Sequence, residues 1–149
     1  MESIQEVIQV LKTHLEIPLE IDGQGGCCIL LGEKLILNID EEPSGRNVLL
    51  SAELGSVPPG AYRIRLFQSS LQANALPPPR YGILAFSPLE DTLILFEYLP
   101  LQPLDKNSLL EFLNVFVGKA QIWQDSLIEG SVPNVVGDQT KSPGLFNLG

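Results

Sequence analysis

The sequence predicts an α+β fold in the order helix, three strands, helix, two strands, helix. Three segments carry apolar residues at the spacings of three and four that an amphipathic α-helix requires. The intervals between them hold short runs rich in Val, Ile and Leu, separated by turn residues. Strands joined by short turns pair antiparallel, so we expect a twisted antiparallel sheet with helices packed on it.

The first helix is predicted over residues 3–15. Ser3 and Glu6 have the spacing of a capping box, in which each side chain satisfies a free backbone amide of the other residue. Pro18 ends the helix, because the residue before a proline is pushed out of the helical conformation. One face of this helix is apolar and is formed by Ile4, Val7, Ile8, Leu11 and Leu15.

Three strands are predicted next, at residues 27–31, 34–39 and 47–54. The dipeptide Gly32-Glu33 between the first two suits a two-residue type II′ hairpin turn, because glycine comes first. Acidic residues, proline and glycine at 40–45 form the following turn. Consecutive strands with such short turns form an antiparallel meander.

The second half begins with a helix predicted at residues 61–74, followed by strands at 81–86 and 92–99. A final helix starts after Asp105, whose side chain can cap it, and ends at Gly130. The predicted domain therefore covers residues 1–130. Beyond it, residues 131–149 contain Gly, Pro, Ser and Asn without periodicity, which predicts a flexible tail.

Composition restricts the class of function. The 149 residues include 18 acidic and 9 basic side chains, which gives a formal net charge of −9. So acidic a chain is repelled by nucleic acid, and we expect no nucleic-acid partner. No apolar run approaches the roughly 18 residues that a membrane helix needs, and the N-terminus lacks the basic region of a signal peptide. We therefore expect a cytoplasmic protein that does not insert into membranes.

The sequence contains no recognisable catalytic or metal-binding pattern. Cys27 and Cys28 are neighbours, so in a strand they point to opposite faces and form no shared site. His14 is the single histidine, with no nucleophile motif to accompany it. The glycine-rich stretch 23–26 lacks the Lys-Ser/Thr of a phosphate-binding loop. We predict that the protein is not an enzyme and uses no cofactor or metal.

Several short phrases occur in order along residues 3–129: LNID at 37–40, NVLLSAELG at 47–55, LQAN at 71–74, LAFSP at 84–88 and YLPL at 98–101. In this order and spacing they resemble the type III secretion chaperone family, known as Tir chaperones or CesT-like class I chaperones. The triple proline 77–79 and the region after Gly130 depart from the family pattern.

The resemblance implies a homodimer that holds the extended N-terminal segment of a secreted effector protein. In the family, the middle helix and neighbouring strands form the two-fold interface, which here implies Tyr62, Leu66, Ser69, Ser70, Ala73, Phe96 and Tyr98. Apolar grooves made by the first helix and adjoining strands receive the client, which here implies Val7, Val10, Leu11, Ile29, Leu31, Leu35 and Leu37.

The resemblance further implies a Gram-negative bacterial source, and it leaves open both the identity of the client and a contact with the ATPase of the export apparatus. One alternative is a small regulatory or ligand-binding α+β module, similar to YbjN-like domains. Such a module would show an internal cavity lined by polar groups rather than an apolar surface groove. A small enzyme is a further alternative, and it would require perturbed carboxylates in a cleft.

Overall fold

The structure is a computed structural model that describes residues 1–15, 19–21 and 25–135. Within these residues it has three helices and six strands. The helices are α1 (Ile4–Leu15), α2 (Ala61–Asn74) and α3 (Lys106–Glu129). The strands are β1 (Glu20–Ile21), β2 (Cys27–Leu31), β3 (Leu35–Glu41), β4 (Asn47–Ser56), β5 (Ile83–Ser87) and β6 (Thr92–Pro100). This order confirms the predicted α+β fold and adds one short strand, β1.

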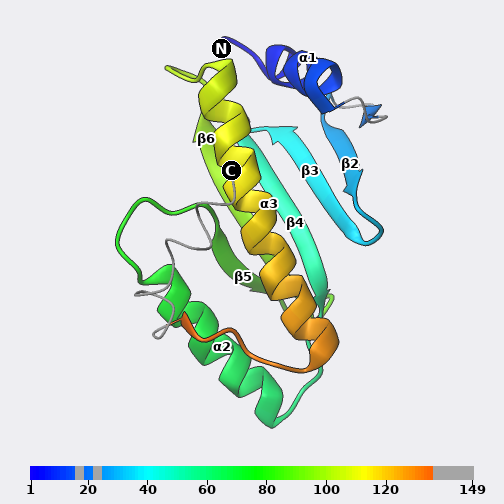
Figure 1. The fold of residues 1–149 in the computed structure, drawn as a ribbon, viewed down its shortest axis with the longest axis vertical. Helices are drawn as coiled ribbons and strands as arrows, with labels where there is room; N and C mark the ends of the chain where they lie inside the picture. The colour runs from blue at the N-terminus through cyan, green and yellow to red at the C-terminus, as the bar shows by residue number, and fades with distance from the viewer. Residues whose placement is uncertain (16–18, 22–24, 136–149) are drawn as a thin grey trace.

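The strands form a single antiparallel sheet in the order β1-β2-β3-β4-β6-β5. Strands β2, β3 and β4 make the predicted meander. The longest pairing joins β4 to β6, from Asn47 opposite Pro100 to Ser56 opposite Thr92. One edge of the sheet is therefore β5, and the other is formed by β2 and the short β1 (Figure 1).

Two local predictions need correction. The loop between β2 and β3 has three residues rather than two, because Leu31 pairs directly with Leu35. Strand β5 begins two residues later than expected, because Gly82 has a φ of +133°. A Cβ atom at Gly82 would lie 2.7 Å from Leu95 Cδ1, so a side chain does not fit there.

The core lies between one face of the sheet and the helices α1 and α3. Figure 1 shows α3 crossing over the sheet while α2 lies beside β5. Asp105 accepts a hydrogen bond from the Ser108 amide and Gly130 adopts the left-handed conformation, so both predicted ends of α3 are confirmed. Fully or almost fully buried side chains in this core include Val7, Leu11, Ile29, Leu37, Leu50, Leu95, Leu109, Phe116 and Trp123.

Candidate partner-binding surface

The face of the sheet that points away from the core, called the outer face here, carries apolar side chains. Strand residues alternate between the two faces, so each core residue has an outer neighbour. On this face Leu30 of β2 lies directly opposite Ile36 of β3, and Leu49 of β4 lies opposite Tyr98 of β6. Leu30, Ile36 and Tyr98 are 53%, 45% and 49% exposed.

The apolar residues of the outer face form two clusters. The β2–β3 cluster consists of Leu30 and Ile36. The β6 cluster consists of Ile94, Phe96 and Tyr98, of which the last two rings meet edge-on with centroids 6.2 Å apart. Both clusters remain accessible among the described residues, so they are available to a partner.

A polar stripe separates the two clusters. Glu53 of β4 stands between Ile36 and Ile94, since it pairs with Ile94 and its neighbour Ala52 pairs with Leu37. One row along, Asn38 pairs with Ser51, which pairs with Phe96 on β6. The stripe formed by Asn38, Ser51 and Glu53 limits the continuous apolar area on the sheet.

Helix α2 has one face turned inward and one turned outward. Leu66, Ser69, Ser70 and Ala73 are buried, whereas Ile64 and Leu71 are 61% and 68% exposed. The Ser70 hydroxyl donates to the Leu66 carbonyl one turn earlier, which satisfies this buried hydroxyl within the helix. The outward residues Ile64 and Leu71 are therefore the ones available to a partner.

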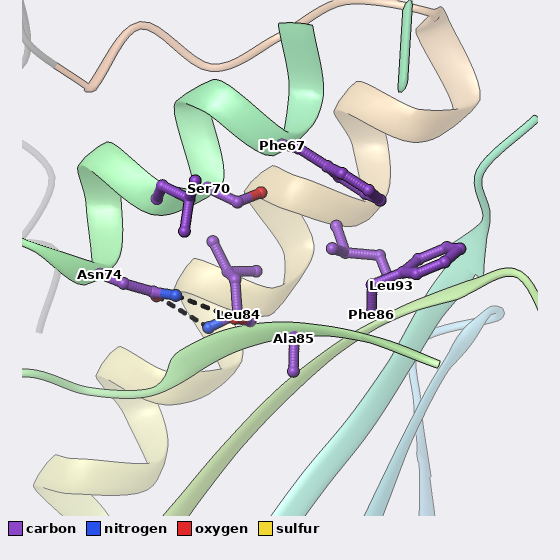
Figure 2. Close-up of a pocket in the computed structure, with 8 residues that line it drawn as sticks. Phe67, Ser70, Asn74, Leu84, Ala85, Phe86 and Leu93 are labelled. Atoms are coloured by element: carbon purple, nitrogen blue, oxygen red, sulfur yellow. Dashed lines mark hydrogen bonds between the residues drawn. The ribbon is translucent and has the colours of Figure 1, made fainter. Parts of the chain in front are cut away.

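An apolar hollow of about 260 Å³ lies between α2 and β5 (Figure 2). Its polar side chains are Ser70 and Asn74, and both are engaged in hydrogen bonds within the chain. The remaining wall is apolar and comes from Phe67, Leu71, Leu84, Ala85, Phe86 and Leu93. This lining does not match the polar cavity that the ligand-binding alternative requires.

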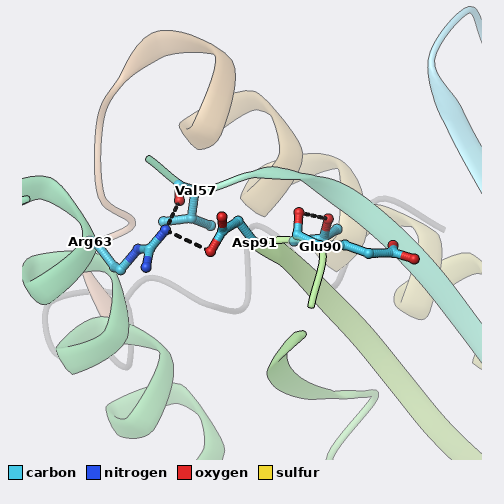
Figure 3. Close-up of polar contacts among 5 residues, drawn as sticks. Val57, Arg63, Glu90 and Asp91 are labelled. Atoms are coloured by element: carbon cyan, nitrogen blue, oxygen red, sulfur yellow. Dashed lines mark hydrogen bonds and ion pairs between the residues drawn. The ribbon is translucent and has the colours of Figure 1, made fainter. Parts of the chain in front are cut away.

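The Arg63 side chain connects the start of α2 to the β5–β6 turn through polar contacts (Figure 3). Its guanidinium donates to the Val57 carbonyl and forms an ion pair with Asp91 at 3.1 Å. The guanidinium carbon also lies 4.9 Å from the centre of the Phe86 ring. The Arg63 Nε has no hydrogen-bond partner among the described residues. Arg63 therefore positions α2 and is not free for a ligand.

The chain after α3 returns across α2. The Ser69 hydroxyl donates to the Pro133 carbonyl at 2.6 Å. The Tyr62 hydroxyl lies 2.8 Å from the Ser131 carbonyl oxygen, within hydrogen-bonding distance. Val135 is buried. Residues 131–135 of the predicted tail therefore lie against α2, whereas residues 136–149 are outside the described part of the chain.

A carboxyl and an ammonium group lie within the core side of the sheet. Glu97 pairs with the core residue Leu50 and so faces inward, where burial raises the pKa of its carboxyl above the ordinary value. A backbone hydrogen bond and the charges of Arg80 and Lys119 partly oppose this rise in pKa. For Lys119, burial has the opposite effect and lowers the pKa of the ammonium group, because burial disfavours its charged form. This ammonium group donates a hydrogen bond to the Gly82 carbonyl at 2.7 Å.

The residues implied for the client groove fall mainly on the inner side. Val10 and Leu31 are half-buried, and five others are buried in the core of the single chain: Val7, Leu11, Ile29, Leu35 and Leu37. The exposed apolar residues of this region are Leu30 and Ile36, which are chain neighbours of the implied residues. The groove assignment thus remains a prediction, and the accessible surface beside it is the β2–β3 cluster.

The residues implied for the dimer interface divide into two groups. Phe96 and Tyr98 lie together in the β6 cluster on the outer face. Tyr62 is half-buried, and Leu66, Ser69, Ser70 and Ala73 are covered by the chain's own core or by the segment after α3. The interface remains a prediction, for which α2 offers Ile64 and Leu71 as exposed contacts.

Within the described part of the chain, no group of three or more His, Cys, Asp or Glu side chains could hold a metal ion. None of the described helices is long and apolar enough to cross a membrane.

The order of elements and the arrangement of α2 beside the β5–β6 hairpin can be compared with known proteins. The family model of the Tir chaperone protein (CesT) family matches residues 6–124. The chain belongs to the Tir chaperone family. No individual curated protein sequence matches it.

Solved structures of secretion chaperones share the fold at low sequence identity. The Yersinia pestis type III secretion chaperone SycH, solved with a fragment of YscM2, is 14% identical with a TM-score of 0.63, covering 79% of this chain and 97% of that chain. The ExsC–ExsE complex contains a chain 17% identical with a TM-score of 0.63, covering 85% and 97%. The HopA1–SchA chaperone–effector complex gives 15% identity and a TM-score of 0.59, covering 82% and 93%.

Proposed function

We propose that this chain is a type III secretion chaperone that acts as a homodimer and holds the N-terminal segment of an effector protein without turnover. Membership of the Tir chaperone family and the fold shared with chaperones solved in complexes support this proposal. The observation that carries it is the outer face, where Leu30, Ile36 and Tyr98 are exposed.

The β2–β3 cluster fits an extended client segment. A chain in extended conformation presents alternate side chains to one surface, and Leu30 and Ile36 form an adjacent apolar pair on two strands. Binding the extended segment opposes its folding, because a partner that binds only the unfolded form shifts the equilibrium toward it. The net charge of −9 offsets the aggregation risk of exposed apolar surface.

The second copy is proposed to contact the outward face of α2 and the β6 cluster. These surfaces lie on either side of β5, because Leu71 lines the hollow between α2 and β5, and Ala85 of β5 pairs with Ile94 of the β6 cluster. Ile64 and Leu71 would then form one apolar contact with the second copy, and Phe96 and Tyr98 another. We place the assembly in the bacterial cytoplasm, while a contact with the export ATPase stays a prediction.

The test is light scattering coupled to size exclusion, with and without co-expressed N-terminal fragments of effector proteins from the same genome. We expect a dimer of twice 16.3 kDa that retains one of the fragments. Leu30→Asp should abolish capture of the fragment and leave the dimer, whereas Leu71→Asp should yield monomers. Both introduce one carboxylate into an apolar contact.

Leu89→Asp is the matched control, because Leu89 is 96% exposed in the β5–β6 turn and belongs to neither surface. This variant should behave as the wild type in both measurements. A wild-type protein that stays monomeric and retains no fragment would contradict the proposal. If the Leu30→Asp variant still retains the effector fragment, the client binds to a surface other than the β2–β3 cluster.

A further inference from the structure

Strand β5 is an edge strand, since its neighbour on one side is β6 and, in the described part of the chain, no strand pairs with its other side. An edge strand presents unpaired backbone amides and carbonyls, which can recruit a strand from another chain. Proteins that bind extended segments need one such edge, but a second open edge invites unwanted pairing. Whether the backbone groups of β5 are already hydrogen-bonded therefore affects which edge of this sheet can pair with a strand of another chain.

The side chain of Asn74, the last residue of α2, pairs with the backbone amide and carbonyl of Leu84 on the outward side of β5. The Asn74 Nδ2 donates to the Leu84 carbonyl at 2.9 Å, and the Leu84 amide donates to the Asn74 Oδ1 at 2.9 Å (Figure 2). Leu84 stands opposite Leu95 of β6, yet both of its backbone groups point away from that strand. A primary amide carries its NH2 donor and its oxygen acceptor on the same carbon, so it can pair with the amide and the carbonyl of one residue, as a strand would.

The rest of α2 follows the same edge. The Phe67 and Phe86 rings pack with centroids 4.9 Å apart, two positions along β5 from Leu84. Arg63, one turn earlier in α2, lies over the other end of the strand at Phe86. The helix thus lies along β5 from end to end, and Asn74 supplies its hydrogen bonds to the strand backbone at Leu84.

The opposite edge is different. Strand β1 pairs with β2 only at Cys27 and Cys28. On that side, Ile29, Leu30 and Leu31 have no strand partner among the described residues, and Leu30 belongs to the exposed β2–β3 cluster. We propose that Asn74 closes the β5 edge to strand addition, so that any chain that adds a strand to this sheet does so at the β1–β2 edge.

The closure of the β5 edge by Asn74 is a property of the folded chain and does not depend on the client binding proposed above. The first test therefore uses the protein alone. Sedimentation velocity over a concentration series compares the wild type with Asn74→Ala, Asn74→Asp and Asn114→Ala. Asn74→Ala frees both Leu84 groups, and the opened edge should strengthen self-association by roughly tenfold or more. Asn114→Ala is the matched control, because Asn114 is an exposed helical asparagine on α3.

Asn74→Asp separates edge opening from simple destabilisation. Its carboxylate still accepts from the Leu84 amide but cannot donate to the Leu84 carbonyl, so we expect a loss of stability similar to that of Asn74→Ala. The carboxylate also places a negative charge on the edge, and charges on an edge strand oppose pairing. Asn74→Asp should therefore not associate more than the wild type. Equal association of both variants would overturn the proposal.

Amide hydrogen exchange on the wild type keeps the proposal testable if Asn74→Ala does not fold. The Leu84 amide should exchange at least roughly tenfold more slowly than the amide of Leu89 in the exposed turn, after correction for intrinsic rates. Rapid exchange at Leu84 in the wild type would overturn closure. A folded Asn74→Ala that associates no more than Asn114→Ala would overturn it as well.

Discussion

On the core face of the sheet, Ile29 and Leu50 are buried under α1 and α3. On the outer face, Leu30 of β2, Ile36 of β3 and Tyr98 of β6 are about half exposed. Both faces carry apolar residues, so the presence of apolar side chains alone does not separate them. The two faces differ in whether their apolar residues are continuous. The core face forms one continuous apolar cluster. On the outer face, the polar residues Asn38, Ser51 and Glu53 separate the apolar residues into two clusters. A divided surface can serve partners and still stay soluble.

The largest expected effect comes from adjacent residues on opposite faces of β2. Ile29→Ala leaves a cavity in the core and should lower the free energy of unfolding by about 2–5 kcal/mol. Leu30→Ala should lower it by about 0.5 kcal/mol or less, because this side chain is already half in water. Urea unfolding of both variants provides the measurement. Equal losses would mean that the two faces are buried alike in solution.

The polar stripe can be removed at its centre. Ser51→Val places an apolar, β-branched side chain between Asn38 and Phe96 and should change the free energy of unfolding by about 0.5 kcal/mol or less. The apolar area beside Phe96, which this change enlarges, should instead promote self-association, seen as concentration-dependent light scattering. Ser51→Thr is the control, since it adds a branched side chain but keeps the hydroxyl. If both variants scatter alike, the division of the outer face has no role in solubility.

Glu97 is the exception to the apolar core face and should give the smallest effect. Because burial raises the pKa of its carboxyl in the folded chain, its ionisation costs stability. This cost is absent below the ordinary pKa, grows as the pH rises above that value, and is complete above the raised pKa. Relative to the wild type, Glu97→Gln should therefore be more stable near neutral pH than at about pH 4.

Urea unfolding at the two pH values measures this difference. The charges of Arg80 and Lys119 lower the pKa of Glu97, so the variant also removes the attraction of its carboxylate to these two charges. A variant that is less stable than the wild type at neutral pH would show that these attractions outweigh the cost of burial. Glu97 would then stabilise the folded chain despite its position on the apolar core face.

Local signals in the sequence were sufficient for most elements. The predicted bounds of α2 and β2 are those of the structure, and the Asp105 cap and the Gly130 end of α3 are confirmed. Each of these depends on residues close together in the chain. The two-residue strand β1 was missed, because two residues show no periodicity.

The faces of the elements were harder to assign. In β2 and the start of β3, consecutive residues on both faces are apolar, so the alternation that normally identifies the buried face is missing. Helix α2 likewise has two stripes, and the buried one contains Ser69 and Ser70. Asn74 gave no signal, because its role depends on the placement of β5. In β2, β3 and α2, contacts between residues far apart in the sequence determine which face is buried.

The return of the chain across α2 has a consequence for biosynthesis. Ser69 and its partner Pro133 are 64 residues apart in the sequence. At roughly 5–20 residues per second, the ribosome needs about 3–13 s to add them. Helix α2 is therefore synthesised well before the segment that covers its Tyr62 and Ser69 side. During this interval that side of α2 is open to other nascent chains, and the docking of residues 131–133 ends this exposure.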